Sequence, residues 1–245
     1  MKISILGLGH LGGALLRGLL KAGCSAEDVT VYDRSPARFS GLEGVHAVCD
    51  AAEAVRASDV CFIVLKSAGF FELAPSLSGE TGDGRVFVSF MAGVTLEALR
   101  EALPGAAVVR AMPSIAIESC EGITAYTKAP EPVAELLGRL GYAFETEPEN
   151  IEKVMAFASC GIGFAAYLLE AFRGAGLAMG FSEEECGRIT AQTFKNALDR
   201  GHYAETVRAV ATKGGATEQG VLHMDGAGVP GAVSAAVRKA YERML

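Results

Sequence analysis

A glycine-rich turn close to the N-terminus constrains the fold more than any other feature. Residues 7–12 read Gly-Leu-Gly-His-Leu-Gly, preceded by a short apolar run, 2–6, and followed by a segment with an apolar stripe. A strand that enters a G-x-G-x-x-G turn and leaves it as a helix is typical of dinucleotide binding. Gly7 permits the tight turn, Gly9 lets the backbone approach a pyrophosphate, and Gly12 lets the helix pack against the strand. The N–H groups at the helix N-terminus then face the phosphates.

An acidic residue ends the second run of strand type, 29–32. Asp33 follows the last glycine of the turn by 21 residues, the spacing at which a carboxylate meets the adenosine ribose. Arg34 comes next, and an arginine at this point holds a ribose 2′-phosphate. Asp33 therefore favours NAD and Arg34 favours NADP. Both cofactors stay open, with a slight preference for NADP. The alternative is a turn without a ligand, with Asp33 as a helix cap.

Strand-type runs alternate with helical patterns up to residue 148. Further strands are expected at 45–48, 60–65, 85–90, 107–110, 123–126 and 142–144. The run 60–65 is apolar throughout, which is typical of a parallel strand that is buried on both faces. Because alternating strands and helices form βαβ units, we predict an α/β dinucleotide-binding domain over residues 1–148. Its sheet is expected to be doubly wound, mainly parallel and of the Rossmann type.

The pattern becomes entirely helical after Pro148. Helices are expected at 151–179, 182–200, 204–211, 217–224 and 229–245. The first of these is apolar on nearly all sides, and such a helix must be buried. Fewer than a hundred helical residues cannot easily bury it within one chain. We therefore predict an all-helical dimerisation and substrate domain over 149–245 and a homodimer, with higher oligomers left open.

Composition excludes several classes of protein. The net charge is −7 with acids and bases interspersed, so there is no basic stripe for nucleic acid. The six cysteines are scattered without metal-ligand spacing, which predicts no metal site and reduced thiols in a cytoplasmic protein. No signal peptide is evident. The most apolar region, 154–181, is interrupted by Glu170 and Arg173, so we expect no membrane span.

A second glycine loop lies between two helical patterns near the C-terminus. It reads Thr212-Lys213-Gly214-Gly215-Ala216-Thr217. Two glycines before a helix form a pocket of backbone N–H groups that is suited to a carboxylate, and the two threonines add hydroxyls. The alternative is a plain helix–helix turn with Thr217 as its N-cap. The residues alone slightly favour that alternative.

Six motifs together resemble the pyrroline-5-carboxylate reductase family, and the resemblance covers the whole chain. Besides the turn at 7–12, Val64-Leu65-Lys66 stands where the family has Val-Lys-Pro-Gln. The segment 88–94 resembles its Ser-x-x-Ala-Gly-Val. Residues 110–114 resemble Arg-x-Met-Pro-Asn, residues 191–193 match Ala-Gln-Thr, and 212–217 stand at Ser-Pro-Gly-Gly-x-Thr.

The resemblance implies a Rossmann domain followed by helices that swap around a partner. It implies transfer of a hydride from NADPH or NADH to a small anionic substrate, the cyclic imino acid 1-pyrroline-5-carboxylate, which gives L-proline. Thr217 is then the catalytic residue, beside the imine nitrogen. The expected substrate-binding residues are Thr212, Lys213, Gly214, Gly215, Ala216 and Thr217. The expected cofactor-binding residues are Gly7, Leu8, Gly9, His10, Leu11, Gly12, Asp33, Arg34, Lys66, Ala92, Gly93 and Ser114.

The chain departs from the family motifs around both loops. The family's Ser-Pro becomes Thr212-Lys213, which puts a charge beside the expected carboxylate site, and its Asn becomes Ser114. Lys213 either binds a second carboxylate or is a solvated turn lysine. Two alternative functions therefore stay open. One is a reductase of another imine or small keto acid, and the other is a non-catalytic, dinucleotide-binding regulatory dimer.

Overall fold

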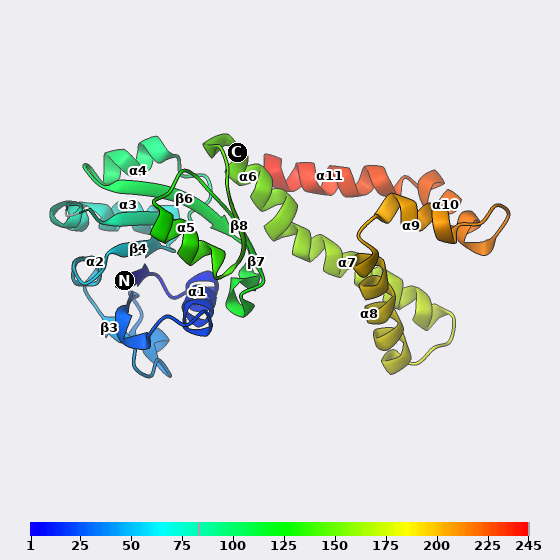
Figure 1. Cartoon of the computed structure of the whole chain (residues 1–245), viewed down its shortest axis with the longest axis horizontal. Coiled ribbons are helices and arrows are strands. Elements are labelled where there is room, and N and C mark those ends of the chain that lie inside the picture. The colour runs from blue at the N-terminus through cyan, green and yellow to red at the C-terminus, as the bar shows by residue number, and fades with distance from the viewer. Residues whose placement is uncertain (83, 245) are drawn as a thin grey trace. The chain divides into compact units, whose positions relative to one another are not determined.

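The chain forms two compact units in a computed structural model that describes residues 1–82 and 84–244. The first unit comprises Met1–Ser159 with Arg243 and Met244, and the second comprises Cys160–Glu242. The first contains the sheet and its helices, and the second is helical (Figure 1). The functional boundary that we expect at residue 148 stays a prediction.

In the described residues, eight strands form one sheet in the order β3-β2-β1-β4-β5-β6-β7-β8. They are β1 (Ile3–Leu6), β2 (Val29–Tyr32), β3 (His46–Val48), β4 (Val60–Ile63), β5 (Val86–Ser89), β6 (Ala107–Pro113), β7 (Gly122–Tyr126) and β8 (Gly141–Glu145). Strands β1 to β6 run parallel, β7 is antiparallel to β6, and β8 is parallel to β7. The predicted Rossmann-type, mainly parallel sheet is therefore confirmed. Strand β6 continues to Pro113, where we expected a turn after Arg110, because residues 111–113 pair with β7.

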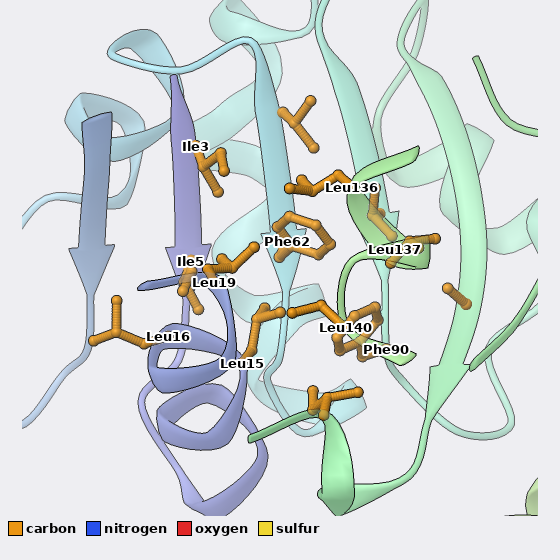
Figure 2. Close-up of a cluster of buried hydrophobic side chains, with 14 of the residues drawn as sticks. Ile3, Ile5, Leu15, Leu16, Leu19, Phe62, Phe90, Leu136, Leu137 and Leu140 are labelled. Carbon is orange, nitrogen blue, oxygen red and sulfur yellow. The ribbon is translucent and has the colours of Figure 1, made fainter. Parts of the chain in front are cut away.

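Helices cover both faces of the sheet, as a doubly wound fold requires. One face carries α1 (His10–Lys21) and α5 (Glu131–Gly138), and the other carries α2 (Ala51–Arg56), α3 (Ser67–Leu73) and α4 (Leu96–Ala102). Neighbouring residues of a strand point to opposite faces. Phe62 accordingly packs with Leu15 and Leu136 of the first pair of helices (Figure 2), whereas Ile63 faces the second set. Burial on both faces explains the continuous apolar run in β4.

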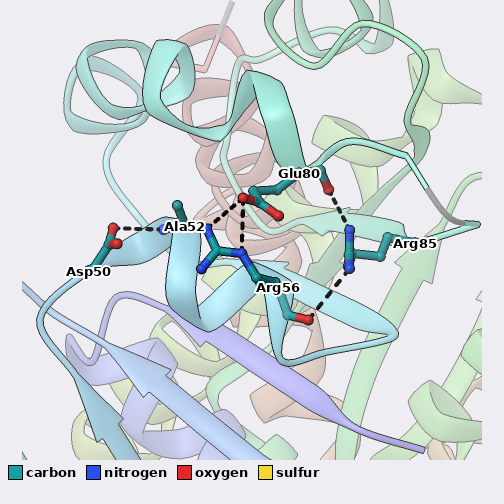
Figure 3. Close-up of polar contacts among 5 residues, drawn as sticks. All are labelled: Asp50, Ala52, Arg56, Glu80 and Arg85. Carbon is teal, nitrogen blue, oxygen red and sulfur yellow. Dashed lines mark hydrogen bonds and ion pairs between the residues drawn. The ribbon is translucent and has the colours of Figure 1, made fainter.

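Polar contacts fix the start and the end of α2 (Figure 3). Asp50 is the N-cap, as its position before the helix predicts, and its carboxylate accepts a hydrogen bond from the N–H of Ala52 at 3.0 Å. Arg56 donates to the Glu80 carboxylate at 2.7 Å. Arg85 donates to the main-chain oxygens of Glu80 and Arg56 at 2.9 and 3.4 Å. These bonds connect α2 to the segment that enters β5.

The long apolar helix that we expected over 151–179 is interrupted. It consists of α6 (Ile151–Val154), a π turn (Met155–Ser159) and α7 (Cys160–Ala178). A π turn inserts one extra residue into an α-helix, and the periodicity of the sequence does not reveal it. The following helices are α8 (Glu183–Arg200), α9 (Tyr203–Val210), α10 (Ala216–Gly226) and α11 (Val229–Glu242). The last helix was expected to extend to Leu245, which lies outside the described residues, but α11 already ends at Glu242.

Large apolar side chains of α7 are exposed in the single chain. Tyr167 is 76% exposed, and Leu168 and Phe172 are exposed as well. Among the described residues, the helical stretch Pro148–Ala178 is long and apolar enough to cross a membrane, by length and composition only. We expected no such stretch because Glu170 and Arg173 interrupt it, but length and composition alone allow one. An exposed apolar surface of this kind marks a contact with another protein or with lipid.

Candidate functional site

The glycine turn lies where the strand order of the sheet reverses. It follows the carboxyl end of β1, which has β2 on one side and β4 on the other. Crossovers that leave in opposite directions open a crevice at this point, and ligands of open α/β sheets bind there. The turn runs directly into α1, whose N-cap is Gly9. The first N–H groups of α1 have no intrahelical partner and therefore face the crevice as donors.

The glycines of the turn have different steric roles. Gly7 has a φ of +105°, which disfavours any side chain. A Cβ on Gly12 would lie 1.9 Å from the carbonyl oxygen of Gly7. A Cβ on Gly9 would have Arg38 Nη1 as its nearest neighbour, at 3.5 Å. The fold itself therefore requires glycine at two positions, whereas the bare backbone at Gly9 leaves space for an occupant. This cradle fits a pyrophosphate.

Asp33 uses its carboxylate inside the protein. Its Oδ2 accepts hydrogen bonds from the N–H of Leu8 at 2.8 Å and from Arg38 Nη1 at 3.3 Å, and its Oδ1 accepts one from the N–H of Ser35 at 2.9 Å. The side chain is only 11% exposed. Asp33 therefore connects the end of β2 to the glycine turn and orients Arg38. The contact with the ribose that we expect for Asp33 stays a prediction.

The two arginines after β2 point to different places. Arg34 lies 3.5 Å from Glu72 of α3 and lines a pocket of about 180 Å³ with Tyr32. Arg38 lies beside Gly9 instead and lines a different, larger cleft. Arg38 was not among the residues that we expected from the sequence. The sequence does show a basic residue in the short 3-10 turn after Asp33, but the direction in which its side chain points depends on the fold of that turn.

That larger cleft has a volume of about 940 Å³ and extends from the glycine turn along α1. Its polar and glycine lining includes Gly9, His10, Arg17, Arg38, Ser40 and Glu118. Arg17 forms a two-point ion pair with Glu118, at 2.8 and 3.1 Å. The hydrogen bonds from Arg17 hold the pKa of the Glu118 carboxyl below its ordinary value. His10 is exposed as the first residue of α1.

The other residues expected to bind the cofactor lie at the carboxyl ends of parallel strands. Lys66 is exposed after β4, and Ala92 and Gly93 are exposed after β5. Ser114 follows β6 but is buried, and its Oγ accepts a hydrogen bond from the N–H of Ile123 at 3.0 Å. Its hydroxyl is therefore engaged in joining β6 to β7.

The second glycine loop connects α9 to α10 in the helical unit. Gly214 has a φ of +77°, and the N–H of Gly215 donates to the carbonyl oxygen of Thr212 at 2.8 Å. Helix α10 starts at Ala216 with Gly215 as its N-cap. The interpretation of Thr217 as an N-cap is therefore wrong: this threonine lies inside the first turn and is exposed. Sequence alone placed the helix start one residue too late.

Taken together, the sheet, the switch point and the glycine turn define a dinucleotide-binding α/β protein with an added helical unit. A family model described as pyrroline-5-carboxylate reductase dimerisation matches residues 148–245, and one described as NADP oxidoreductase, coenzyme F420-dependent, matches residues 2–93. Proteins named pyrroline-5-carboxylate reductase from Mycobacterium tuberculosis and Methanosarcina acetivorans are each 29% identical to this chain. Each alignment covers 99% of this chain, and the alignments cover 95% and 96% of the two relatives respectively. The chain is therefore similar over its whole length to proteins of the pyrroline-5-carboxylate reductase family.

Solved structures agree with this similarity at the level of the fold. The crystal structure of a Plasmodium falciparum pyrroline carboxylate reductase with NADP bound has a TM-score of 0.90 at 19% identity. The alignment covers 100% of this chain and 97% of that one. A pyrroline-5-carboxylate reductase from Coxiella burnetii has a TM-score of 0.89 at 21% identity, with 99% and 97% coverage.

Proposed function

We propose that the protein reduces 1-pyrroline-5-carboxylate to L-proline with NADPH or NADH. The observation that carries this proposal is the glycine turn at the switch point, in a chain whose full-length relatives bear the name of that enzyme. When it is bound, the nicotinamide supplies the hydride that adds to the imine carbon. The protein positions the reactants and excludes water. No catalytic pair of strong acid and base is needed, since a cyclic imine takes up a proton near neutral pH.

The dinucleotide end of the site belongs to the first unit. The N–H groups of the first turn of α1 bind the pyrophosphate, and Gly9 leaves space for it. Arg38 binds the 2′-phosphate of NADP, because its guanidinium lies at the glycine turn while Arg34 lies near Glu72. This arrangement supports a preference for NADP. Lys66, Ala92, Gly93 and Ser114 are proposed to complete the cofactor site.

The substrate end of the site belongs to the loop 212–217. Its backbone N–H groups and the N-terminus of α10 hold the substrate carboxylate. The hydroxyl of Thr217 contacts the imine nitrogen and orients the ring. Lys213, which is exposed, faces the carboxylate from the loop.

We also propose a cytoplasmic homodimer that buries the apolar side chains of α7. Their exposure in the single chain supports this assembly, as does the match of residues 148–245 to a dimerisation model. The functional division of the chain falls at residue 148, between a cofactor domain and a domain for dimerisation and substrate binding.

A spectrophotometric assay tests the activity. The purified protein should consume NADPH or NADH when it is given 1-pyrroline-5-carboxylate, and proline should accumulate in equal amount. The Thr217→Ala variant should lose turnover while it still binds the dinucleotide, which a calorimetric titration measures. An absence of turnover with both cofactors would refute the proposed reaction. Unchanged turnover in Thr217→Ala would refute the role of the hydroxyl.

A further inference from the structure

The loop 212–217 already holds a carboxylate, and it belongs to the chain itself. The peptide N–H of Gly214 donates a hydrogen bond to Oε2 of Glu218 at 2.6 Å. Glu218 is the third residue of α10, so its side chain folds back over the helix N-terminus onto the loop. Its carboxylate therefore occupies the Gly214 N–H, which is one of the donors that the proposed function assigns to the substrate carboxylate.

The loop lysine does not neutralise this charge. The described residues contain no ion pair that involves Glu218, although Lys213 lies in the same loop and is exposed. Glu218 is itself half-buried, which weakens the screening of its charge by water. A second carboxylate at the same N–H groups meets a like charge and finds the Gly214 N–H engaged. Two carboxylates on one site repel each other.

We propose that Glu218 is a specificity-determining residue that competes with a carboxylate on the substrate. This inference rests on the proposed function, since it assumes that the loop faces the imine. Glu218 weakens the binding of carboxylate-bearing cyclic imines and leaves the binding of the same ring without a carboxylate unchanged. The site therefore favours uncharged cyclic imines more strongly than a loop with a neutral residue at position 218.

The kinetic test compares two substrates that differ only in the carboxylate. The ratio of kcat/KM for 1-pyrroline-5-carboxylate to that for 1-pyrroline is measured for the wild type, Glu218→Gln and Glu218→Ala. Both substitutions remove the charge, and we expect each to raise the ratio about tenfold through a lower KM for the carboxylated imine. A ratio within about twofold of the wild type in both variants, or a lower ratio, overturns the proposal.

Glu185→Gln is a matched control for helix capping. Glu185 is also the third residue of its helix, α8, and its carboxylate accepts a hydrogen bond from the N–H of Ser182 at 2.9 Å. It lies outside the glycine loop, so Glu185→Gln removes a carboxylate charge from a helix cap without changing the charge at the loop. The substrate ratio of this variant should equal that of the wild type. A rise equal to that of Glu218→Gln would show a general effect of a lost cap and would overturn the proposal.

A binding measurement separates this proposal from the proposed reaction. Calorimetry with L-proline and with pyrrolidine, in the presence of oxidised dinucleotide, requires no hydride transfer. Glu218→Gln should bind L-proline about tenfold more tightly than the wild type and pyrrolidine equally well. If the wild type reduces neither imine but this shift is found, the reaction is wrong and the role of Glu218 stands. If L-proline binds no better to Glu218→Gln, the role of Glu218 is wrong.

Discussion

Gly9 and Gly12 share a motif but differ in what surrounds the place of a side chain. We expect Gly9→Val to fold with a small drop in melting temperature and to lose dinucleotide binding, because the nearest atom to its Cβ, Arg38 Nη1, lies at an ordinary contact distance of 3.5 Å while the valine fills the space proposed for the pyrophosphate. We expect Gly12→Ala to lose about 3 kcal/mol of stability, because its Cβ overlaps the Gly7 carbonyl oxygen. Thermal melts and titrations with NADPH measure both effects. Normal NADPH affinity in Gly9→Val would contradict the assignment of the cradle.

Arg38 and Arg34 offer a matched pair for the choice of cofactor. Replacing Arg38 by Ala should raise the KM for NADPH tenfold or more, because the variant loses roughly one charged hydrogen bond to the 2′-phosphate. The KM for NADH should stay nearly unchanged, because NADH has no 2′-phosphate. Arg34→Ala should have a smaller effect, since that side chain approaches Glu72. Steady-state kinetics with both cofactors measures this difference. An equal loss for NADPH and NADH, or a loss confined to Arg34→Ala, would contradict the assignment.

Residue identity indicated where the dinucleotide site lies but not how each side chain is used. The turn 7–12 and Asp33 are visible in the sequence because their spacing reflects one βαβ unit. The partners of Asp33 are not visible, because the N–H of Leu8 reaches it only once β1 and β2 are paired in register. Arg38 was missed for the same reason. Glu218 was missed because the periodicity of a helix does not report where its first side chains fold back.

A buried ion pair connects two elements of the first unit. Arg110 of β6 pairs with Glu152 of α6, and the two side chains are 5% and 12% exposed. Within the described residues, Nε of Arg110 has no hydrogen-bond partner. The sheet therefore holds the first turn of the long helical segment through one charge pair.

Removing one partner of this pair should be costly. We expect Glu152→Ala to reduce the free energy of unfolding by about 3–5 kcal/mol, because it leaves a buried guanidinium unpaired. The double variant Arg110→Met/Glu152→Leu should recover much of that loss. Asp199→Ala, which breaks an exposed pair with Lys195 on α8, should change stability by less than about 1 kcal/mol. Denaturant unfolding measures all three, and equal losses in the two single variants would contradict the burial argument.

Elements with a strong local signal were predicted well. Every strand was expected because its apolar run is bounded by turn residues. The N-caps Asp50 of α2 and Ser182 of α8 also depend on local side-chain hydrogen bonds. The extension of β6 and the π turn before α7 depend on contacts with distant residues. Pairing with β7 lengthens β6. Ser159, at the end of the π turn, donates a hydrogen bond to the carbonyl oxygen of Pro113 at 3.4 Å.

For the molecule as a whole, the exposed face of α7 predicts assembly. The wild type should sediment as a dimer, whereas Tyr167→Asp should sediment mainly as a monomer, because it places a charge on the apolar face. Lys195→Glu on α8 reverses the charge of an exposed residue and should leave the dimer intact. Sedimentation velocity gives the masses. A monomeric wild type, or a dimeric Tyr167→Asp, would contradict assembly through α7.

The apolar character of the segment 151–179 is enough to predict an interface, because a helix that is apolar on nearly all sides has to be covered. The sequence alone does not reveal how little of this helix one chain covers. Only 6% of the most apolar stretch within Pro148–Ala178 is buried in the single chain. That fraction depends on where the other helices of the unit pack, which their own periodicity does not specify.

Because its own chain covers so little of this helix, the stability of the folded protein depends on the protein concentration as well as on the sequence. If two copies protect each other, mass action links folding to protein concentration. Diluting the sample should then lower its melting temperature, and newly synthesised chains must find one another before aggregation or proteolysis removes them.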